Sequence, residues 1–365
     1  MRVLHLSSES TWRGGEQQIA YLVKGSIENG IDAIVACRRG SRMEEFCLEN
    51  NLPHISLRFK SAYDIQTIWK LQSYCRRSGI DIIQTHSSKS HTLAVICGIL
   101  GLRIPQLLTR RVDFPIKDNW FSRFKYNYKG IRKIICVSNA IRKMIESEIK
   151  DQDKLLVVHD GIDLSRFSNP SEWLRKTYSI PKDHLIVGNT SAITAQKDYG
   201  TFLKVVERVV SVRKDVHFFI IGDGHDKAFF EQYVLENGLD EFVTFTGFLK
   251  NISEVLPSLD IFLFTSQTEG LGTSVLDAMA ASLPIVATNA GGVGEIINDN
   301  VNGLLYSVKD DEGLADGLMK LMNDQDLCSS LVDKARETVK SFSKEAMTRS
   351  TIKVYEEILG VRPVE

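Results

Sequence analysis

Short apolar runs alternate along the chain with longer segments of helical periodicity. Each run contains mainly Val, Ile, Leu or Phe, a pattern typical of strands that are buried on both faces of a parallel sheet. The helical segments between them suit right-handed strand–helix–strand crossovers. The runs are residues 3–6, 33–36, 82–84, 106–108 and 134–137 in the first half, and 185–187, 217–221, 243–245, 261–264 and 285–287 in the second half.

The length of 365 residues suits two domains. Residues 163–171 are rich in turn formers and follow another apolar run, so the boundary is expected there. We therefore predict two α/β domains with doubly wound parallel sheets, residues 1–165 and 166–344, facing a central cleft. The tail, about residues 345–365, is amphipathic, which predicts a helix that closes the second domain or packs back on the first.

The composition, with 43% hydrophobic and 25% charged residues, is that of an ordinary soluble protein. The six cysteines are scattered without a CxxC pair, which indicates reduced, buried thiols in a cytoplasmic protein. The apolar run at the start is too short for an export signal. The longest run, residues 92–102, is well short of the roughly 20 residues that span a bilayer. We expect no transmembrane helix.

The net charge of −1 hides an asymmetry. Residues 1–165 carry 25 Lys and Arg against 17 Asp and Glu, whereas the rest of the chain carries 20 against 29. The excess in the first half is either chance or a sign of an anionic partner, such as a phosphate or a lipid surface. The segment from Asp118 to Lys133 interleaves aromatic and basic residues. It predicts a helix on an anionic membrane or, the alternative that we favour, a helix with an aromatic core face and a basic outer face.

Candidate binding loops follow several of the predicted strands, where ligands of open parallel sheets bind. After the first strand, Arg13, Gly14 and Gly15 open a helix, and glycines and free amides there suit an anion, although an ordinary turn explains them equally well. Lys197 lies near a helix start, where the helix dipole disfavours a cation. A bound phosphate would explain its position; the alternative is an ordinary surface lysine. Phe248 follows another strand and would stack on a base or pack in the core.

The stretch TEGLGTSVLD places two acids around a glycine-rich turn. Thr273 or Ser274 is suited to cap the following helix, and Asp277 in its first turn would favour the helix dipole. Glu269 has no such structural explanation, because its loop needs no carboxylate. We expect Glu269 to hold sugar hydroxyls and the free amides of residues 272–274 to hold a diphosphate. The spacing of His86 and His91 is not that of metal ligands, so we expect no metal site.

Four segments resemble motifs of the retaining glycosyltransferases of family 4 (glycosyl transferases group 1), which have the GT-B fold. They are WRGGEQQ, CVSNAIRKMI, VVHDGIDLSRF and TEGLGTSVLDAMAASLPIVATNAGGVGEII, and together they cover nearly the whole chain. The last is the most specific, and the first is weak by itself. The resemblance implies an N-terminal acceptor domain, a C-terminal nucleotide-sugar domain, and a final helix, about residues 345–359, that returns to the first domain.

The resemblance also implies roles for single residues. Lys197 would stabilise the departing diphosphate, Glu269 would bind the hydroxyls of the donor sugar, and Asp277 would hold the ribose. Donor-binding residues are Gly14, Gly15, Phe248, Gly270, Leu271, Gly272, Thr273, Ser274 and Asp277; acceptor-side residues are Arg13, His86, Lys89 and Arg111; and catalytic residues are Lys197, Glu269 and Arg110.

The sequence departs from the family pattern at three places. Ser191 and Ala192 stand where the family has an arginine before the lysine. Arg110 or Arg111 stands where many members have a histidine. An arginine there could restore the missing charge and grip phosphate with two hydrogen bonds, but it could not be a general base. Asp277 replaces the second glutamate of the family pair and has a shorter reach.

The expected activity is retaining, metal-independent hexosyl transfer from a UDP-sugar, with GDP second, to a glycan or a lipid-linked acceptor of a cell-surface polysaccharide, lipopolysaccharide or glycolipid. No cofactor and no nucleic acid partner are expected. The enzyme would work in the cytoplasm or at the inner face of the cell membrane. Two alternatives remain. One is a non-hydrolysing nucleotide-sugar epimerase, for which Glu269 and Asp113 are the available acids; the other is a nonenzymatic module that binds nucleotide-sugars.

Overall fold

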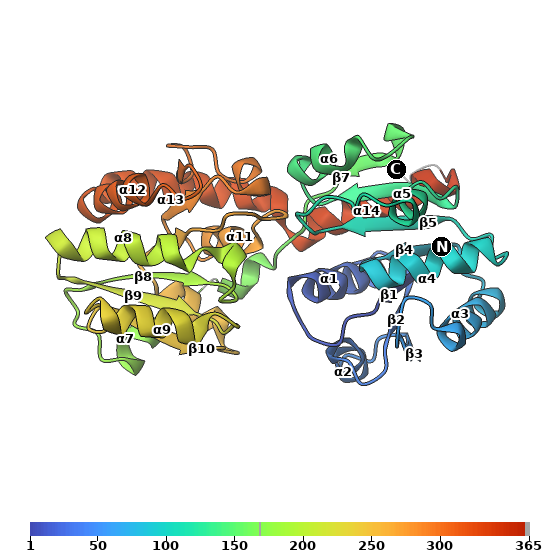
Figure 1. Ribbon diagram of the computed structural model, residues 1–365, viewed down its shortest axis with the longest axis horizontal. Helices are drawn as coiled ribbons and strands as arrows, with labels where there is room; N and C mark the ends of the chain where they lie inside the picture. Colours follow the sequence, from blue (N-terminus) through green and yellow to red (C-terminus); the bar gives the residue numbers. More distant parts are fainter. Residues whose placement is uncertain (168, 362–365) are drawn as a thin grey trace. The chain divides into compact units, whose positions relative to one another are not determined.

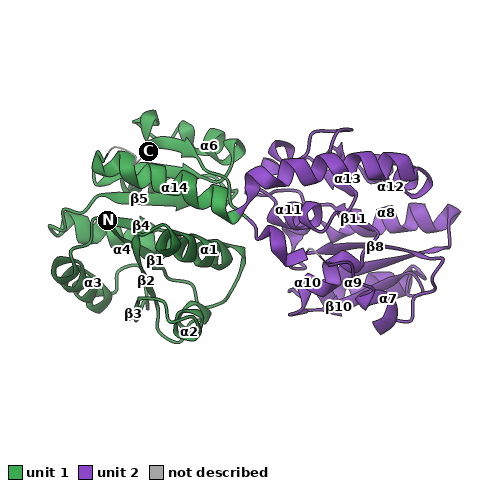
Figure 2. Ribbon diagram, turned by 180° about the vertical axis from the view of Figure 1, so that it is seen from behind, with its two compact units in different colours: residues 1–161, 344–365 green, residues 162–343 purple. Residues whose placement is uncertain are grey.

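The computed structural model describes residues 1–167 and 169–361. The chain forms two compact units, which are shown in different colours in Figure 2. Unit 1 comprises Met1–Gly161 and Lys344–Glu365, and unit 2 comprises Ile162–Ser343. Among the described residues, no helix combines the length and the apolar character that crossing a bilayer requires.

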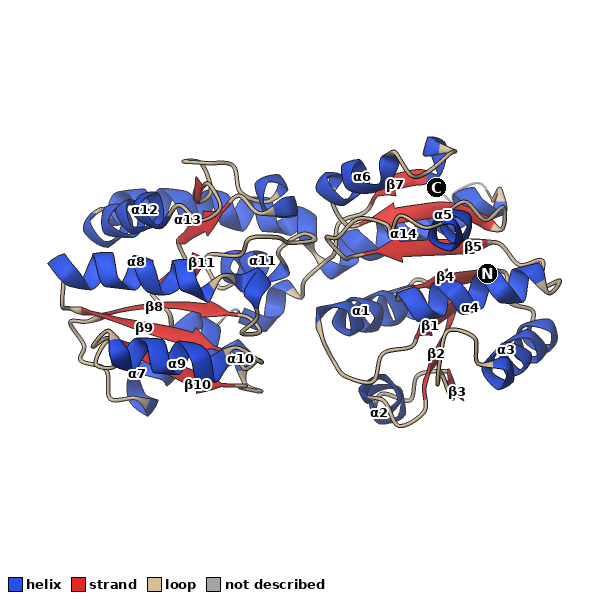
Figure 3. Ribbon diagram, in the orientation of Figure 1, coloured by secondary structure: helices blue, strands red, loops and turns tan. Residues whose placement is uncertain are grey.

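The described part of unit 1 is built on a sheet of seven parallel strands in the order β3-β2-β1-β4-β5-β6-β7 (Figure 3). The direction of winding reverses between β1 and β4, and ligands of doubly wound sheets bind at the carboxyl ends of such a pair. The strands are β1 (Arg2–Ser7), β2 (Asp32–Arg38), β3 (His54–Leu57), β4 (Ile82–Thr85), β5 (Gln106–Arg110), β6 (Ile131–Cys136) and β7 (Leu155–Val157). The α-helices are α1 (Gly14–Glu28), α2 (Arg42–Glu49), α3 (Ile65–Ser78), α4 (Ser88–Ile99), α5 (Trp120–Tyr126), α6 (Asn139–Glu146) and α14 (Lys344–Leu359).

Unit 2 repeats this architecture (Figure 1). Its described residues form a sheet of six parallel strands in the order β10-β9-β8-β11-β12-β13, so the winding reverses between β8 and β11. The strands are β8 (Leu185–Thr190), β9 (Val216–Ile221), β10 (Val243–Gly247), β11 (Ile261–Phe264), β12 (Ile285–Thr288) and β13 (Leu304–Tyr306). The α-helices are α7 (Trp173–Thr177), α8 (Tyr199–Val212), α9 (Lys227–Glu236), α10 (Ile252–Val255), α11 (Thr273–Ala280), α12 (Asp311–Asn323) and α13 (Gln325–Val339).

The central strands are buried on both faces, as the continuous apolar runs predict. All residues of β4, β5, β11 and β12 are buried. The sequence analysis missed two strands, β3 with four residues and β13 with three. Both lie at an edge of their sheet and include half-buried positions, so their sequences show no long apolar run. The six cysteines are free, and Cys328 is the half-buried one.

The last helix, α14, belongs to unit 1 and packs against α1. Its buried side chains Met347, Val354 and Tyr355 join a core that includes Val3. The hydroxyl of Tyr355 donates a hydrogen bond to Oε1 of Gln84 in β4. A helix whose Tyr355 lies 271 positions after Gln84 in the sequence thereby completes the core of the first unit, because its amphipathic face needs an apolar partner.

The segment from Asp118 to Lys133 differs from the prediction that we favoured. It is not one helix, since α5 ends at Tyr126 and β6 begins at Ile131. The expected burial is also reversed within α5. Trp120 leaves 77% of its surface exposed and Phe124 is also exposed, whereas Lys125 is 6% exposed. The aromatic face of this helix is therefore not a core face.

Candidate functional site

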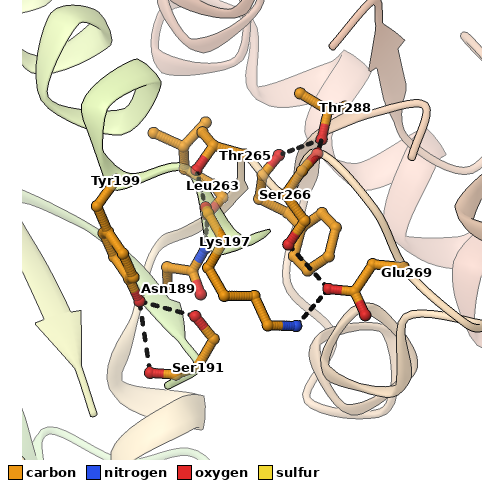
Figure 4. Close-up of polar contacts among 10 residues, drawn as sticks. Asn189, Ser191, Lys197, Tyr199, Leu263, Thr265, Ser266, Glu269 and Thr288 are labelled. Atoms are coloured by element: carbon orange, nitrogen blue, oxygen red, sulfur yellow. Dashed lines mark hydrogen bonds and ion pairs between the residues drawn. The ribbon is translucent and has the colours of Figure 1, made fainter. Parts of the chain in front are cut away.

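Two loops meet at the carboxyl ends of β8 and β11 in unit 2 (Figure 4). The 3₁₀ turn Ala195–Lys197 follows β8, and Glu269 follows β11. The ammonium group of Lys197 forms an ion pair with Oε1 of Glu269. The hydroxyl of Ser266 donates a second hydrogen bond, of 2.8 Å, to the same oxygen. The two residues that the sequence singled out separately are thus in direct contact at the point where the winding of the sheet reverses.

Hydrogen bonds to main-chain carbonyls fix the two loops against each other. The Thr265 hydroxyl donates to the carbonyl of Lys197 at 3.1 Å, and the amide of Gln267 donates to the carbonyl of Gln196 at 2.8 Å. The Thr288 hydroxyl donates to the main chain of the same loop at 2.6 Å. Because the main chain on both sides is tied, the ion pair is held in position by the fold and not by its own attraction alone.

Gly291, which follows β12, packs against the main-chain carbonyl of Glu269. Gly291 has φ of +55°, a left-handed conformation that L side chains rarely adopt. A Cβ atom added at this position would lie 2.0 Å from the carbonyl oxygen of Glu269. The amide of Gly292 donates to that same oxygen at 3.3 Å. The glycines of TNAGGVGE, which the sequence indicated only as a turn, thus allow the loop that carries Glu269 to approach closely.

The ion pair has unused hydrogen-bonding capacity. The side chains of Lys197 and Glu269 are 21% and 12% exposed, so both are accessible but mostly buried. Lys197 carries three N–H donors, of which Glu269 uses one. Oε2 of Glu269 accepts none of the hydrogen bonds found among the described residues. Free donors for an anion and a free carboxylate oxygen for a hydroxyl therefore lie side by side.

The start of α11 corrects two predictions about the helix after this loop. The N-cap is Gly272, at φ of +94°, and not Thr273 or Ser274. Asp277 is the fifth residue of the helix and lies beyond its first turn, so it is not a capping acid. Burial raises the pKa of Asp277 to about 7, against the opposing charge of Arg166. No hydrogen bond or ion pair to the Asp277 side chain is found in the described part of the chain.

The remaining donor-side candidates lie on the same unit or on α1. Leu271 is buried, whereas Phe248, which follows β10, is exposed and free to stack on a flat ring. A Cβ atom added at Gly14 or Gly15 would meet nothing within 4 Å, so the packing of unit 1 does not require glycine at either position. Glu16 accepts the amide of Arg13 at 3.1 Å, and burial raises its pKa.

A buried polar network occupies the switch point of unit 1. Nε of Arg111 donates to Asp160 at 2.9 Å, and NH1 of Arg111 donates to Nδ1 of His86 at 3.1 Å. Because arginine only donates, the proton of His86 is on Nε2, which faces Nδ1 of His5 at 3.2 Å. Burial and the charge of Arg111 hold the pKa of His86 well below its usual range. Both nitrogens of His86 are thus engaged, which leaves it poorly suited to act as a base.

Asp160 was not among the predicted site residues, although the sequence carried a signal. It lies in VVHDGIDLSRF, one of the four segments that resemble the family, and Arg111 is one of the two arginines that stand where many members have a histidine. Arg111 and Asp160 face each other as an ion pair whose side chains are 13% and 8% exposed. Such a pair requires both partners, because either charge would be costly if it were buried alone.

Arg110, predicted as a catalytic phosphate ligand, does not lie in this network. Its side chain is buried, and its guanidinium donates to the hydroxyl of Tyr126 and the carbonyl of Phe114. It could reach a ligand only if those contacts were broken. Lys89, predicted on the acceptor side, is exposed in the first turn of α4. Among the described residues, no group of three or more His, Cys, Asp or Glu side chains is arranged to hold a metal ion.

The comparisons with known families agree with the motifs. The family described as Glycosyltransferase Family 4 matches residues 12–166, and the family described as Glycosyl transferases group 1 matches residues 171–338. The N-acetyl-alpha-D-glucosaminyl L-malate synthase of Bacillus anthracis is 25% identical over 307 residues, which is 81% of this chain and 80% of that protein. The lipopolysaccharide core biosynthesis glycosyltransferase LpsE of Rhizobium meliloti is 23% identical and covers 96% of both chains.

Solved structures share the fold. The Anabaena protein HepE, in complex with UDP and glucose, has a TM-score of 0.84 at 18% identity, covering 96% of this chain and 98% of its own. A glycosyltransferase of Rickettsia africae has a TM-score of 0.86 at 20% identity, covering 98% of each chain. The two family matches show that the chain belongs to glycosyltransferase family 4, and the solved structures show that each unit has the Rossmann-like architecture of the GT-B fold.

Proposed function

We propose that this glycosyltransferase moves a hexosyl group, with retention of configuration, from a UDP-sugar to a glycan or lipid-linked acceptor in the synthesis of a cell-surface polysaccharide, lipopolysaccharide or glycolipid. The observation that carries the proposal is the contact between Lys197 and Glu269 at the β8–β11 switch point. UDP is favoured over GDP because HepE is described in complex with UDP and because an Escherichia coli relative is named as using UDP-Gal.

The leaving diphosphate needs positive charge that is already in place when the glycosidic bond breaks. The two unused N–H donors of Lys197 supply it, and so do the free amides at the N-terminus of α11, whose helix dipole favours an anion. The helix begins directly after a left-handed Gly272, which turns the chain into the helix within one residue. In this proposal Lys197 acts on the phosphate while Glu269 keeps the ammonium in place.

In this proposal the two acids of TEGLGTSVLD, Glu269 in the loop and Asp277 in α11, bind different ends of one donor. Glu269 accepts hydroxyls of the sugar through its free oxygen, and Asp277 accepts the ribose hydroxyls. The unpartnered and partly buried carboxylate of Asp277 supports this role, because a carboxylate in such a place is costly until it receives hydrogen bonds. Its placement beyond the first turn removes the competing explanation as a helix cap.

Retention follows, in this proposal, from attack on the same face as the leaving group. The bond from the anomeric carbon to the phosphate oxygen breaks, the bond to the acceptor oxygen forms, and the acceptor proton passes to the departing phosphate oxygen. His86 offers no free nitrogen to act as a base instead. The anomeric configuration of the product, determined by NMR, tests this step, and an inverted product would contradict it.

The proposal gives no step to a metal ion. In this proposal Lys197 and the helix amides neutralise the diphosphate, a role that a divalent cation has in other enzymes. Transfer should therefore be unchanged by EDTA and by added Mg²⁺. Loss of transfer in EDTA, with recovery on adding a divalent cation, would contradict this part of the proposal.

A panel of nucleotide-sugars in thermal-shift assays should first identify the donor, because a ligand stabilises according to its affinity and concentration. With that donor, Glu269→Gln and Lys197→Met should each reduce transfer by about a hundredfold or more. Lys227→Met removes a half-exposed ion pair with Glu231 elsewhere in unit 2 and is the matched control. Epimerised donor formed without acceptor would favour an epimerase, and tight binding without turnover would favour a binding module.

The proposed location is the cytoplasm, at the inner face of the cell membrane, where a lipid-linked acceptor would be presented. Fractionation of cells that express the tagged chain tests the location. Recovery of the chain mainly with the membrane fraction, and its release by high salt, is the expected result.

A further inference from the structure

An unusually exposed group of apolar side chains lies on α3, α5 and the loop between β5 and α5 in unit 1. We call it the aromatic surface, and it consists of Tyr63, Ile65, Trp69, Phe114, Trp120 and Phe124. Ile65, Trp69 and Trp120 leave 79%, 70% and 77% of their surface exposed. Single exposed apolar residues are ordinary, but two exposed tryptophans within one such group indicate a binding surface.

The aromatic surface is continuous between the two helices. α4 packs against both α3 and α5. The rings of Tyr63, just before α3, and Phe121, in α5, lie 6.1 Å apart. The rings of Trp120 and Phe124 stack at 5.6 Å. Ile65 and Trp69 share one face of α3, which lies beside the face that packs in the core.

Positive charge surrounds this surface. Residues 58–70 and 110–125 carry eight Lys and Arg against three Asp. Arg110 and Lys125 are buried, and Arg111 pairs with Asp160, which leaves an excess of two positive charges at the surface. Lys60, Lys70 and Lys117 are exposed beside the apolar side chains. Of the three acids, Asp64 caps α3 and Asp118 pairs with Arg123. The exposed part of the surface therefore combines aromatic rings with basic side chains.

Two buried cations lie directly beneath it without an acidic partner. Nζ of Lys125 contacts the hydroxyls of Ser88, at 3.3 Å, and Thr92, at 3.4 Å. Arg110 contacts a hydroxyl and a carbonyl oxygen. Neither cation forms an ion pair with a carboxylate in the described part of the chain. Burial, and then the neighbouring positive charges of Arg110 and Lys117, lower the pKa of Lys125 to about 8.

We infer that the aromatic surface docks unit 1 on an anionic lipid bilayer, with the rings of Trp69 and Trp120 at the level of the headgroups. Tryptophan and tyrosine favour that interface, and lysines beside them attract anionic lipids. The surface differs from the segment of residues 118–133 that the sequence suggested, because it includes α3 and excludes residues 127–133. It deepens the proposed function by naming the surface that would bring the enzyme to a lipid-linked acceptor.

The charge distinguishes this occupant from two others. A second copy of the chain would bring the same excess of positive charge against itself, which opposes self-association through this surface. A neutral glycan would stack on the aromatic rings but would not explain the exposed Lys60, Lys70 and Lys117 beside them. An anionic bilayer satisfies both the apolar and the charged parts.

Sedimentation with lipid vesicles, in the absence of donor and acceptor, tests the inference. The full chain should bind vesicles that contain phosphatidylglycerol, should bind pure phosphatidylcholine much more weakly, and should lose most binding at high salt. The double variant Trp69→Ser/Trp120→Ser should bind at least about tenfold more weakly. Lys60→Gln/Lys117→Gln should weaken binding on the order of tenfold at low salt and have little effect at high salt.

The matched control is Phe229→Ser/Leu235→Ser, which removes two side chains of unit 2 that are 68% and 62% exposed. It should bind vesicles like the unaltered chain. Thermal melting establishes that each variant is folded. Absence of binding to anionic vesicles, or equal binding by the tryptophan variant and the unaltered chain, would overturn the inference. A dimer in solution that the tryptophan variant abolishes would assign the surface to a second copy. Because the vesicle assay uses no donor, its result can be interpreted even if the proposed transfer activity is not found.

Discussion

The variant Asp277→Asn should make unit 2 more stable and at the same time weaken its proposed binding of nucleotide. Burial raises the pKa of Asp277 from 3.8 to about 7. A change of one pKa unit corresponds to about 1.4 kcal/mol, so the full shift sets a ceiling of about 4 kcal/mol. The side chain keeps partial access to solvent, which screens part of this cost. We therefore expect asparagine, which is never charged, to stabilise the unliganded unit by about 1–2 kcal/mol near pH 8.

The sign follows from proton linkage. The folded chain holds the proton of Asp277 more tightly than the unfolded chain does, so the free energy of unfolding falls as the pH rises from about 4 to about 7. The stabilisation by asparagine should therefore vanish near pH 4 and reach its full value above pH 7. For a domain of this size, it raises the melting temperature by about 2–8 °C.

Thermal melts with and without UDP measure both effects. Loss of a charged acceptor for ribose hydroxyls should weaken UDP binding by about tenfold or more, which reduces the UDP-dependent stabilisation by about 1.4 kcal/mol. Asp333→Asn, at an exposed carboxylate of the same unit, is the control. Equal melting temperatures of Asp277→Asn and the unaltered chain at pH 8, together with undiminished UDP stabilisation, would refute both the burial cost and the ribose role.

Three further predictions concern two glycines and a buried ion pair. Gly15→Ala should leave the melting temperature of the free chain within about 1 °C, because nothing lies within 4 Å of the added carbon, and should weaken donor binding measured by calorimetry. Gly291→Ala should destabilise unit 2 by about 2 kcal/mol or more in urea denaturation, because its Cβ would clash with the Glu269 carbonyl at positive φ; an unchanged midpoint would contradict this. Arg111→Ala should cost about 3 kcal/mol in urea denaturation at pH 7, because it leaves the Asp160 carboxylate buried alone, and adding Asp160→Asn should restore part of that loss; no recovery would contradict the account.

Local sequence determined much of this protein. Ten apolar runs fall on strands of the two sheets, because a strand buried on both faces has apolar side chains at most of its positions. The long motif that contains Glu269 identified the family. Lys197 and Glu269 were each selected because their loops gave them no structural purpose. These inferences succeed because they depend on residues that are adjacent in sequence.

Contacts between distant segments could be decided only by the tertiary structure. The ion pair of Lys197 with Glu269 joins residues 72 positions apart, and the support of Glu269 by Gly291 joins two loops that follow different strands. The role of Asp160 becomes apparent only in the structure, where its carboxylate pairs with Arg111. In α5, periodicity shows that one face is aromatic, but whether that face is buried depends on what the fold places against it. The sequence therefore determined the elements and the chemistry that they carry, and the packing decided which side chains meet and which remain exposed.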